Sequence, residues 1–139
     1  MISITNPIRK NLLPISIGIV YIWFGLLKFS PGLSPAEDLA KQTIHILFFG
    51  LIPSDVSILL LAIWETIIGV FLIANICRKI TVSLALLHIT LTFSPLFLLP
   101  DQVFNGAPFM LTLVGQYIIK NFIIIAVLIS IYKESRKTG

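Results

Sequence analysis

Residues 109–132, FMLTLVGQYIIKNFIIIAVLISIY, decide the fold that this sequence predicts. The run contains one charged residue, Lys120, and its length is typical of a membrane-spanning helix. Lys120 is therefore expected near the bilayer centre, where an unpaired charge costs about 2.5–3.5 kcal/mol on insertion scales. Polar groups elsewhere in the chain must offset this cost.

The composition of the whole chain also indicates a membrane protein. Of its 139 residues, 57% are hydrophobic and 12% are charged, with a mean hydropathy of +1.01. A soluble domain carries about 25% charged residues, so this chain has too few to cover a globule in water. We expect a single integral membrane domain over residues 1–139, in contact with the lipid bilayer. The net charge of +4 does not indicate nucleic acid, because the basic residues flank apolar runs.

The pattern of apolar runs predicts an all-α four-helix bundle with one short extra helix. Ser34-Pro35-Ala36-Glu37 has the form of a capping box, which predicts a helix over about 35–49. At about fifteen residues that helix is too short to span a bilayer, so we expect it to lie in the interface or over the bundle. The four predicted spans are about 11–28, 56–76, 80–99 and 109–132.

The basic residues predict the orientation of the bundle. One side of the membrane receives only Lys28 and Lys41 together with several acidic residues. The excess of basic residues on the other side predicts that both termini are cytoplasmic. The basic residues on that side are Arg9, Lys10, Arg78, Lys79, Lys133, Arg136 and Lys137.

Three predicted spans each carry one ionisable residue at a similar depth. At roughly 1.5 Å per residue, Glu65, His88 and Lys120 all fall within a few ångströms of the midplane. We expect these residues to face one another, with Glu65 as the counter-charge of Lys120. Intramembrane ionisable residues commonly mark functional sites, so the sequence predicts a polar centre inside the bundle.

Helical spacing extends this predicted centre. Gln116 and Lys120 are four residues apart, with Tyr117 and Asn121 beside them, so one face of the last span is polar. Gly18, Tyr21, Gly25 and Lys28 share one side of the first span, and small residues there let helices approach closely. The candidate residues for ligand binding or proton handling are Glu65, His88, Gln116, Tyr117, Lys120 and Asn121, with Lys28, Trp64 and Thr92 as lining or gating residues.

A purely structural interpretation stands beside the functional one. A Glu65–Lys120 pair could simply hold the helices in register, while Lys28 would extend to the outer interface and Trp64 would pack. Haem is not predicted, because the second histidine, His45, lies at a different depth. Metal is not predicted either, because His88 and Glu65 lack further ligands. The single cysteine excludes an intramolecular disulfide, and no catalytic signature is present.

Several short motifs are spread over the chain: Trp23-Phe24-Gly25-Leu26-Leu27-Lys28-Phe29, Pro35-Ala36-Glu37, Trp64-Glu65 with Gly69, and Gly115-Gln116-Tyr117 with Lys120-Asn121. Together they resemble motifs of the DoxX-like superfamily of small four-span bacterial membrane proteins. The resemblance covers residues from about 12 to 130, and it implies four helices in the bacterial inner membrane and a link to quinone through the related thiosulfate:quinone oxidoreductase. No thiosulfate-binding motif is present.

Three functions are compatible with these features. The first is an accessory or quinone-interacting subunit of a membrane redox system, in which the polar centre binds the headgroup and carries protons. The second is a transporter that couples a small molecule to protons through Glu65 and His88. The third is a non-catalytic assembly or scaffold protein, whose polar centre only joins the helices. A homo-oligomer or a redox partner subunit fits the first two.

Overall fold

The computed structural model describes residues 7–106 and 109–137, with side chains from Lys10 onward. The described residues form seven helices and no strand. Four stretches are long and apolar enough to cross a membrane: Lys10–Leu27, Ser54–Ala74, Arg78–Leu98 and Leu113–Lys137. The chain is therefore an all-helical, multi-pass membrane protein. The helices are α1 (Pro7–Leu27), α2 (Glu37–Leu47), α3 (Ser54–Ala74), α4 (Arg78–Leu91), α5 (Pro95–Leu98), α6 (Pro100–Val103) and α7 (Leu113–Lys137).

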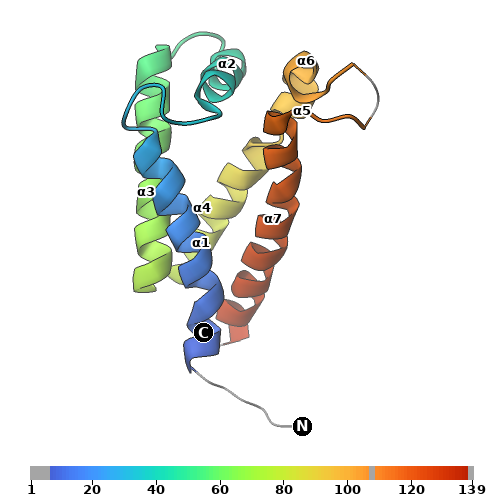
Figure 1. The fold of residues 1–139 in the computed structure, drawn as a ribbon. Coiled ribbons are helices and arrows are strands. Elements are labelled where there is room, and N and C mark those ends of the chain that lie inside the picture. The colour runs from blue at the N-terminus through green and yellow to red at the C-terminus, as the bar shows by residue number, and fades with distance from the viewer. Residues whose placement is uncertain (1–6, 107–108, 138–139) are drawn as a thin grey trace.

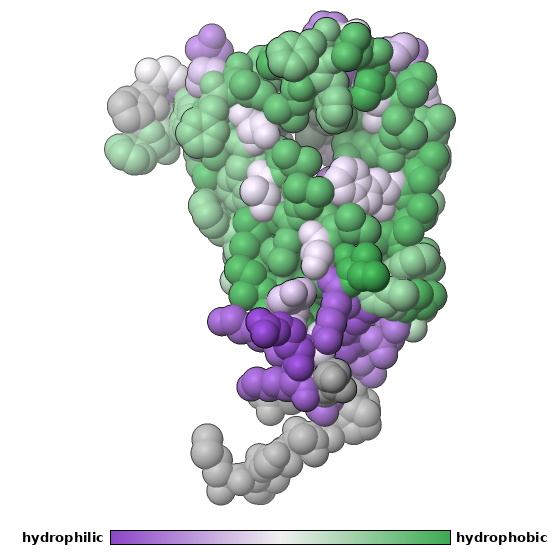
Figure 2. All heavy atoms as spheres, turned by 180° about the vertical axis from the view of Figure 1, so that it is seen from behind, coloured by the Kyte–Doolittle hydropathy of each residue, from purple (hydrophilic) through white to green (hydrophobic). Residues whose placement is uncertain are grey.

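The long helices are arranged as two pairs. Helix α1 packs chiefly against α3, and α4 packs chiefly against α7. Figure 1 shows the pairs meeting at the end where α1 starts and α7 finishes, and diverging toward the end that carries α2, α5 and α6. Apolar side chains cover the visible face of the bundle, and hydrophilic residues gather at the end near the start of α1 (Figure 2). The end near the start of α1 is therefore the more hydrophilic end in this view.

Glycines allow the first helix pair to pack at very short range. A Cβ atom built on Gly69 would lie 2.6 Å from the Gly18 carbonyl oxygen, and one on Gly18 would lie 2.8 Å from the Gly69 carbonyl oxygen. Real Cβ atoms essentially never come that close, so only glycine fits at either position. The expectation that small residues of the first span let helices approach closely agrees with this contact, whereas the partner helix was not predicted.

Two clusters of buried side chains hold the helices together. The larger joins α1, α3, α4 and α7, and it includes Ile68, Leu72, Val82, Leu128 and Ile131. The smaller joins α2, α6 and α7 through Leu39, Val103 and Ile118, at the end of the bundle that carries α2, α5 and α6 and that is drawn as the upper end in Figure 1. The second cluster places α2 across the end of the bundle at which the pairs diverge.

Two of the predicted spans have different ends in the structure. The span predicted at 80–99 is interrupted: α4 ends at Leu91, residues 92–94 form a turn, and α5 begins at Pro95. Proline lacks the N–H that would continue the helix, which explains the break. The last span begins at Leu113 instead of residue 109, because Phe104 and Leu111 form an isolated antiparallel bridge.

The predicted capping box is also wrong. Helix α2 starts at Glu37, and its N-cap, Ala36, makes no side-chain hydrogen bond. Residues before it form a turn, in which the Glu37 N–H donates to the Ser34 carbonyl at 3.2 Å. The Glu37 carboxylate accepts a hydrogen bond from the Gly32 N–H at 2.8 Å. Glu37 therefore fastens the preceding loop instead of closing a box with Ser34.

Candidate functional site

The centre of the candidate site is Glu65, in the middle of α3. Lys28 Nζ donates a hydrogen bond to Glu65 Oε2 at 2.8 Å. His88 Nε2 lies 3.0 Å from Glu65 Oε1. Each oxygen of the carboxylate therefore has its own partner, one directly after the end of α1 and one from α4.

Tyr21 extends this set by one residue. Its hydroxyl oxygen lies 3.1 Å from His88 Nδ1 and 3.2 Å from the Ala85 carbonyl oxygen. The result is a continuous hydrogen-bonded chain across α1, α3 and α4. We call Tyr21, His88, Glu65 and Lys28 the tetrad.

The tetrad lies in an almost closed environment. Tyr21, Glu65 and His88 are each only 5–6% exposed, and the Lys28 side chain is 9% exposed. Aromatic rings surround the imidazole: the His88 ring centroid is 5.4 Å from that of Tyr21 and 5.5 Å from that of Trp64. Charges in such a site interact strongly, because little solvent is present to screen them.

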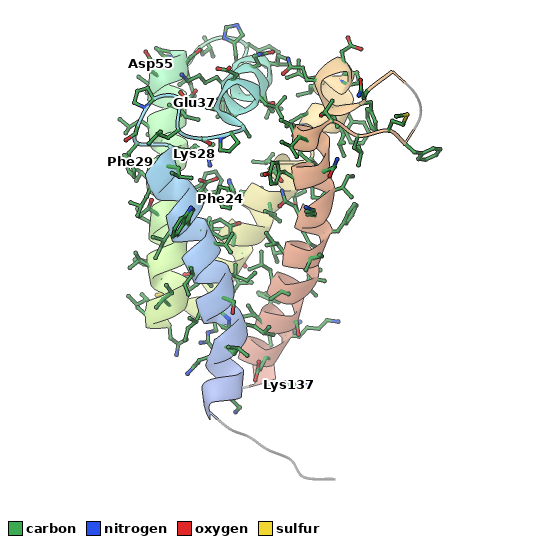
Figure 3. All side chains as sticks on the ribbon, viewed as in Figure 1. Phe24, Lys28, Phe29, Glu37, Asp55 and Lys137 are labelled. Carbon is green, nitrogen blue, oxygen red and sulfur yellow. The ribbon has the colours of Figure 1, made fainter. Side chains whose placement is uncertain are left out.

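The sequence positions these side chains through the helix faces on which they lie. Gly18 and Gly25 bring α1 against α3, and Tyr21 and Lys28 follow on the same face of α1 at helical spacing. Lys28 comes directly after the end of α1, and Figure 3 shows it at the upper end of that helix, below Glu37. From there its ammonium group reaches Glu65.

The charges within the tetrad offset the cost of burying them. The Lys28 ammonium and the Glu65 carboxylate neutralise each other, and His88 satisfies the second carboxylate oxygen. A buried ion pair is tolerated when its remaining lone pairs and protons are hydrogen-bonded. Lys28 also donates to the Phe24 carbonyl at 3.4 Å. The arrangement can therefore hold charge, and can exchange a proton, away from water.

The structure corrects the predicted counter-charge of Glu65. Its partner is Lys28, which was expected at the outer interface, and not Lys120. Lys120 is exposed on α7, and its Nζ lies 5.8 Å from the ring centroid of Tyr117. Gln116 and Tyr117 are exposed as well. The predicted meeting of these three side chains with Glu65 and His88 is therefore wrong.

The divergence of the helix pairs explains why Lys120 is exposed. By helical register Lys120 lies on the same face of α7 as Ile124, Val127 and Ile131, which pack into the larger core cluster. That face loses its neighbours toward the upper end, where the pairs separate (Figure 1). Because α7 begins at Leu113, Lys120 is only about 10 Å from its start at roughly 1.5 Å per residue, within reach of the interface for a long side chain.

Two other predicted residues meet each other instead of the tetrad. Asn121 Nδ2 donates to Thr92 Oγ1 at 3.0 Å, which joins α7 to the turn after α4. Thr92 Oγ1 also donates to the Ile89 carbonyl at 2.5 Å. This pair satisfies polar groups where the third span is interrupted, and it has a structural role there.

Tyr21 is the site residue that the sequence analysis did not select. The signal was available, because Tyr21 shares one face with Gly18, Gly25 and Lys28. The depth of Tyr21 in the first span did not indicate a site residue, because tyrosines near the ends of spans are common in interfacial belts. In the part of the chain that the structure describes, no three His, Cys, Asp or Glu side chains gather as metal ligands would.

Three comparisons of the chain with known proteins found no match. No family model, no curated protein and no solved structure matches the chain.

Proposed function

We propose that this chain is a quinone-interacting or accessory subunit of a membrane redox system, and that the tetrad is its proton-handling centre. The observation that carries the proposal is the buried chain from Tyr21 through His88 and Glu65 to Lys28. Quinone chemistry couples electrons to protons, so a quinone site benefits from a neighbouring group that holds a proton away from water. A structural ion pair needs only Lys28 and Glu65, whereas this centre adds an imidazole and a phenol.

The residues of the site partly fit a quinone headgroup, whose two carbonyl oxygens accept hydrogen bonds. His88 and Glu65 direct their polar atoms toward other members of the tetrad. Lys28 has three N–H donors and makes two hydrogen bonds. The half-buried Trp64 ring packs against His88, and its indole carries one N–H donor. We therefore propose that a headgroup binds beside the tetrad, with Lys28 as a donor, and not between its members.

The resemblance of the motifs to the DoxX-like superfamily supports the same proposal. Lys28, Trp64 and Glu65 all belong to the motifs that carry this resemblance, and all three lie in or against the tetrad. We extend the proposal to the bacterial inner membrane on this basis. A redox partner subunit or a second copy of the chain would then supply or receive the electrons.

The surface of the bundle supports a specific placement in the membrane. Lys10, Arg78, Lys79 and the basic end of α7 lie at the end where α1 begins, so we place this end and both termini on the cytoplasmic side. At the opposite end, Phe49 is 89% exposed and Phe109 is 95% exposed, although both lie outside the four spans. Exposed aromatic side chains at this level favour an interfacial position for α2 and its neighbouring loops.

Quinone binding to the purified protein tests the proposal. Decylubiquinone is titrated into protein in lipid nanodiscs, and the fluorescence of Trp64 is followed in a Trp23→Phe background. Lys28→Met removes a charged donor, which is worth about 1.5–3 kcal/mol, so we expect at least about tenfold weaker binding.

The matched control is Lys120→Met, the same substitution at an exposed lysine outside the tetrad. We expect it to change the affinity less than about twofold, because Lys120 contacts Tyr117 and no member of the tetrad. Wild-type protein that binds no quinone, or equal losses in the two variants, would contradict the proposal.

Proton-coupled transport is the second candidate, and one observation favours it. Close to His88, the third span tightens from regular α-helix into i→i+3 hydrogen bonds at Phe93 and Ser94, and such a stretch inside a helix often marks a functional hinge. Proteoliposomes under an imposed pH gradient separate the two functions. Uptake of a small acid or base that is lost in His88→Ala, without quinone binding, would favour transport.

A further inference from the structure

The Tyr21 hydroxyl has two acceptors within reach and a single proton to donate. Its oxygen lies 3.1 Å from His88 Nδ1 and 3.2 Å from the Ala85 carbonyl oxygen. A phenol donates one hydrogen bond at a time and can accept another. We infer that Tyr21 and His88 form a two-state proton site, in which His88 binds one proton and the Tyr21 hydroxyl redirects its hydrogen bond to Ala85.

In the first state His88 is neutral. Its Nε2–H donates to Glu65 Oε1, since an ionised carboxylate can only accept. Its Nδ1 then carries a lone pair, which accepts the hydrogen bond from the Tyr21 hydroxyl. Every polar atom of the imidazole and the phenol is satisfied in this arrangement.

In the second state His88 is an imidazolium with two N–H donors. The new Nδ1–H donates to the Tyr21 oxygen, and the Tyr21 O–H rotates to donate to the Ala85 carbonyl. A carbonyl oxygen has two lone pairs, so Ala85 can accept this bond besides its bond within the helix. A hydronium ion of the acidified medium supplies the proton, so one of its O–H bonds breaks and one N–H bond forms at His88 Nδ1, while Tyr21 keeps its own proton.

Groups from several elements lie around the His88 imidazole. From α3, Glu65 contacts Nε2 directly, and the Trp64 ring centroid lies 5.5 Å from that of the imidazole. Directly after α1, the Lys28 ammonium is held on the other carboxylate oxygen. From α7, Lys120 is exposed beside Tyr117. The Glu65 carboxylate is therefore the charged group in direct contact with the imidazole.

The two states explain why a tyrosine occupies this position. Phenylalanine would fill the same space, but it would leave Nδ1 without a partner in both states, and a buried polar group without a partner costs about 1–3 kcal/mol. The inference rests on the proposed function only for the use of the bound proton. Proton uptake itself occurs without any ligand.

Infrared difference spectroscopy tests the inference directly. Protein with ring-labelled tyrosine is measured in nanodiscs, without quinone, between neutral and acidic pH. We expect a tyrosine C–O band that changes with pH, is lost in Tyr21→Phe and is retained in Tyr117→Phe, the same substitution at an exposed tyrosine. The change is also expected to be lost in His88→Gln, which cannot take up the proton.

A second measurement requires no substitution at Tyr21 or His88. In His45→Gln protein the only histidine is His88, so its ring nitrogens can be followed by ¹⁵N NMR. We expect Nδ1 to change from an acceptor to an N–H donor on acidification. A histidine that keeps one tautomer over this range, or a tyrosine band that persists in His88→Gln, would overturn the inference, whereas quinone binding through Lys28 would be unaffected.

Discussion

At the scale of single residues, the tetrad and the hydrogen-bonded pair Asn121–Thr92 are separate groups of polar side chains. Glu65 and His88 were predicted to meet from their depth alone, and they do. The partner of Glu65 could not be predicted, because the depth of a Cα atom does not give the position of a lysine ammonium several bonds away. Lys28 comes after the end of its helix and still reaches Glu65 at 2.8 Å.

The two amides on α7 provide a prediction at this scale. Asn121 donates to Thr92 across two helices, whereas Gln116 is exposed. Interhelical hydrogen bonds in membrane proteins contribute about 0.6 kcal/mol on average and up to about 1.7 kcal/mol. Asn121→Leu should lower the free energy of unfolding in detergent by about this amount, and Gln116→Leu should not lower it. Equal losses in the two variants would show that the Asn121 contact is not formed.

At the scale of elements, the sequence predicts the existence of α2 and of the four spans better than their ends, and it does not predict α6. The break after α4 follows from Pro95, but the hydropathy of the run continues through it. The start of α2 depends on a turn stabilised by Glu37 and Gly32, which resembles a capping box in sequence. Such ends are decided by local hydrogen bonds that composition does not reveal.

Helix α2 should detach in acid before the rest of the bundle. The hydrogen bond from Lys41 and that from the Gly32 N–H lower the pKa of Glu37 below its ordinary value of 4.5. The stabilisation from this group is therefore fully present above pH 4.5, and it is lost as the pH falls through the lowered pKa. The protection of the α2 amides, taken relative to the slower chemical exchange of unfolded peptide at each pH, should fall over that range.

Lys41→Met provides the comparison for this prediction. Without its main partner, Glu37 should have a pKa closer to its ordinary value, so the dependence of α2 exchange on pH should become weaker. Exchange that depends on pH equally in the variant and the wild type would exclude this ion pair as the cause.

At the scale of the whole molecule, the sequence predicts the architecture but not the arrangement of the helix pairs. Four spans and a basic end follow from composition, hydropathy and charge. The pattern of each helix shows its polar face, but it does not show which neighbour that face will meet. The pairs diverge where α7 carries Lys120, so its polar face stays open, while α1 closes over Glu65.

The tetrad exists only if Lys28 is the counter-charge of Glu65, and a double-mutant cycle measures that pairing. The free energy of unfolding in mild detergent is measured for Glu65→Gln, Lys28→Met and Lys120→Met, and for the two doubles that contain Glu65→Gln. We expect a coupling of at least about 1 kcal/mol between Lys28 and Glu65, and no more than about 0.5 kcal/mol between Lys120 and Glu65. A strong coupling to Lys120 with none to Lys28 would contradict the tetrad and the function proposed for it.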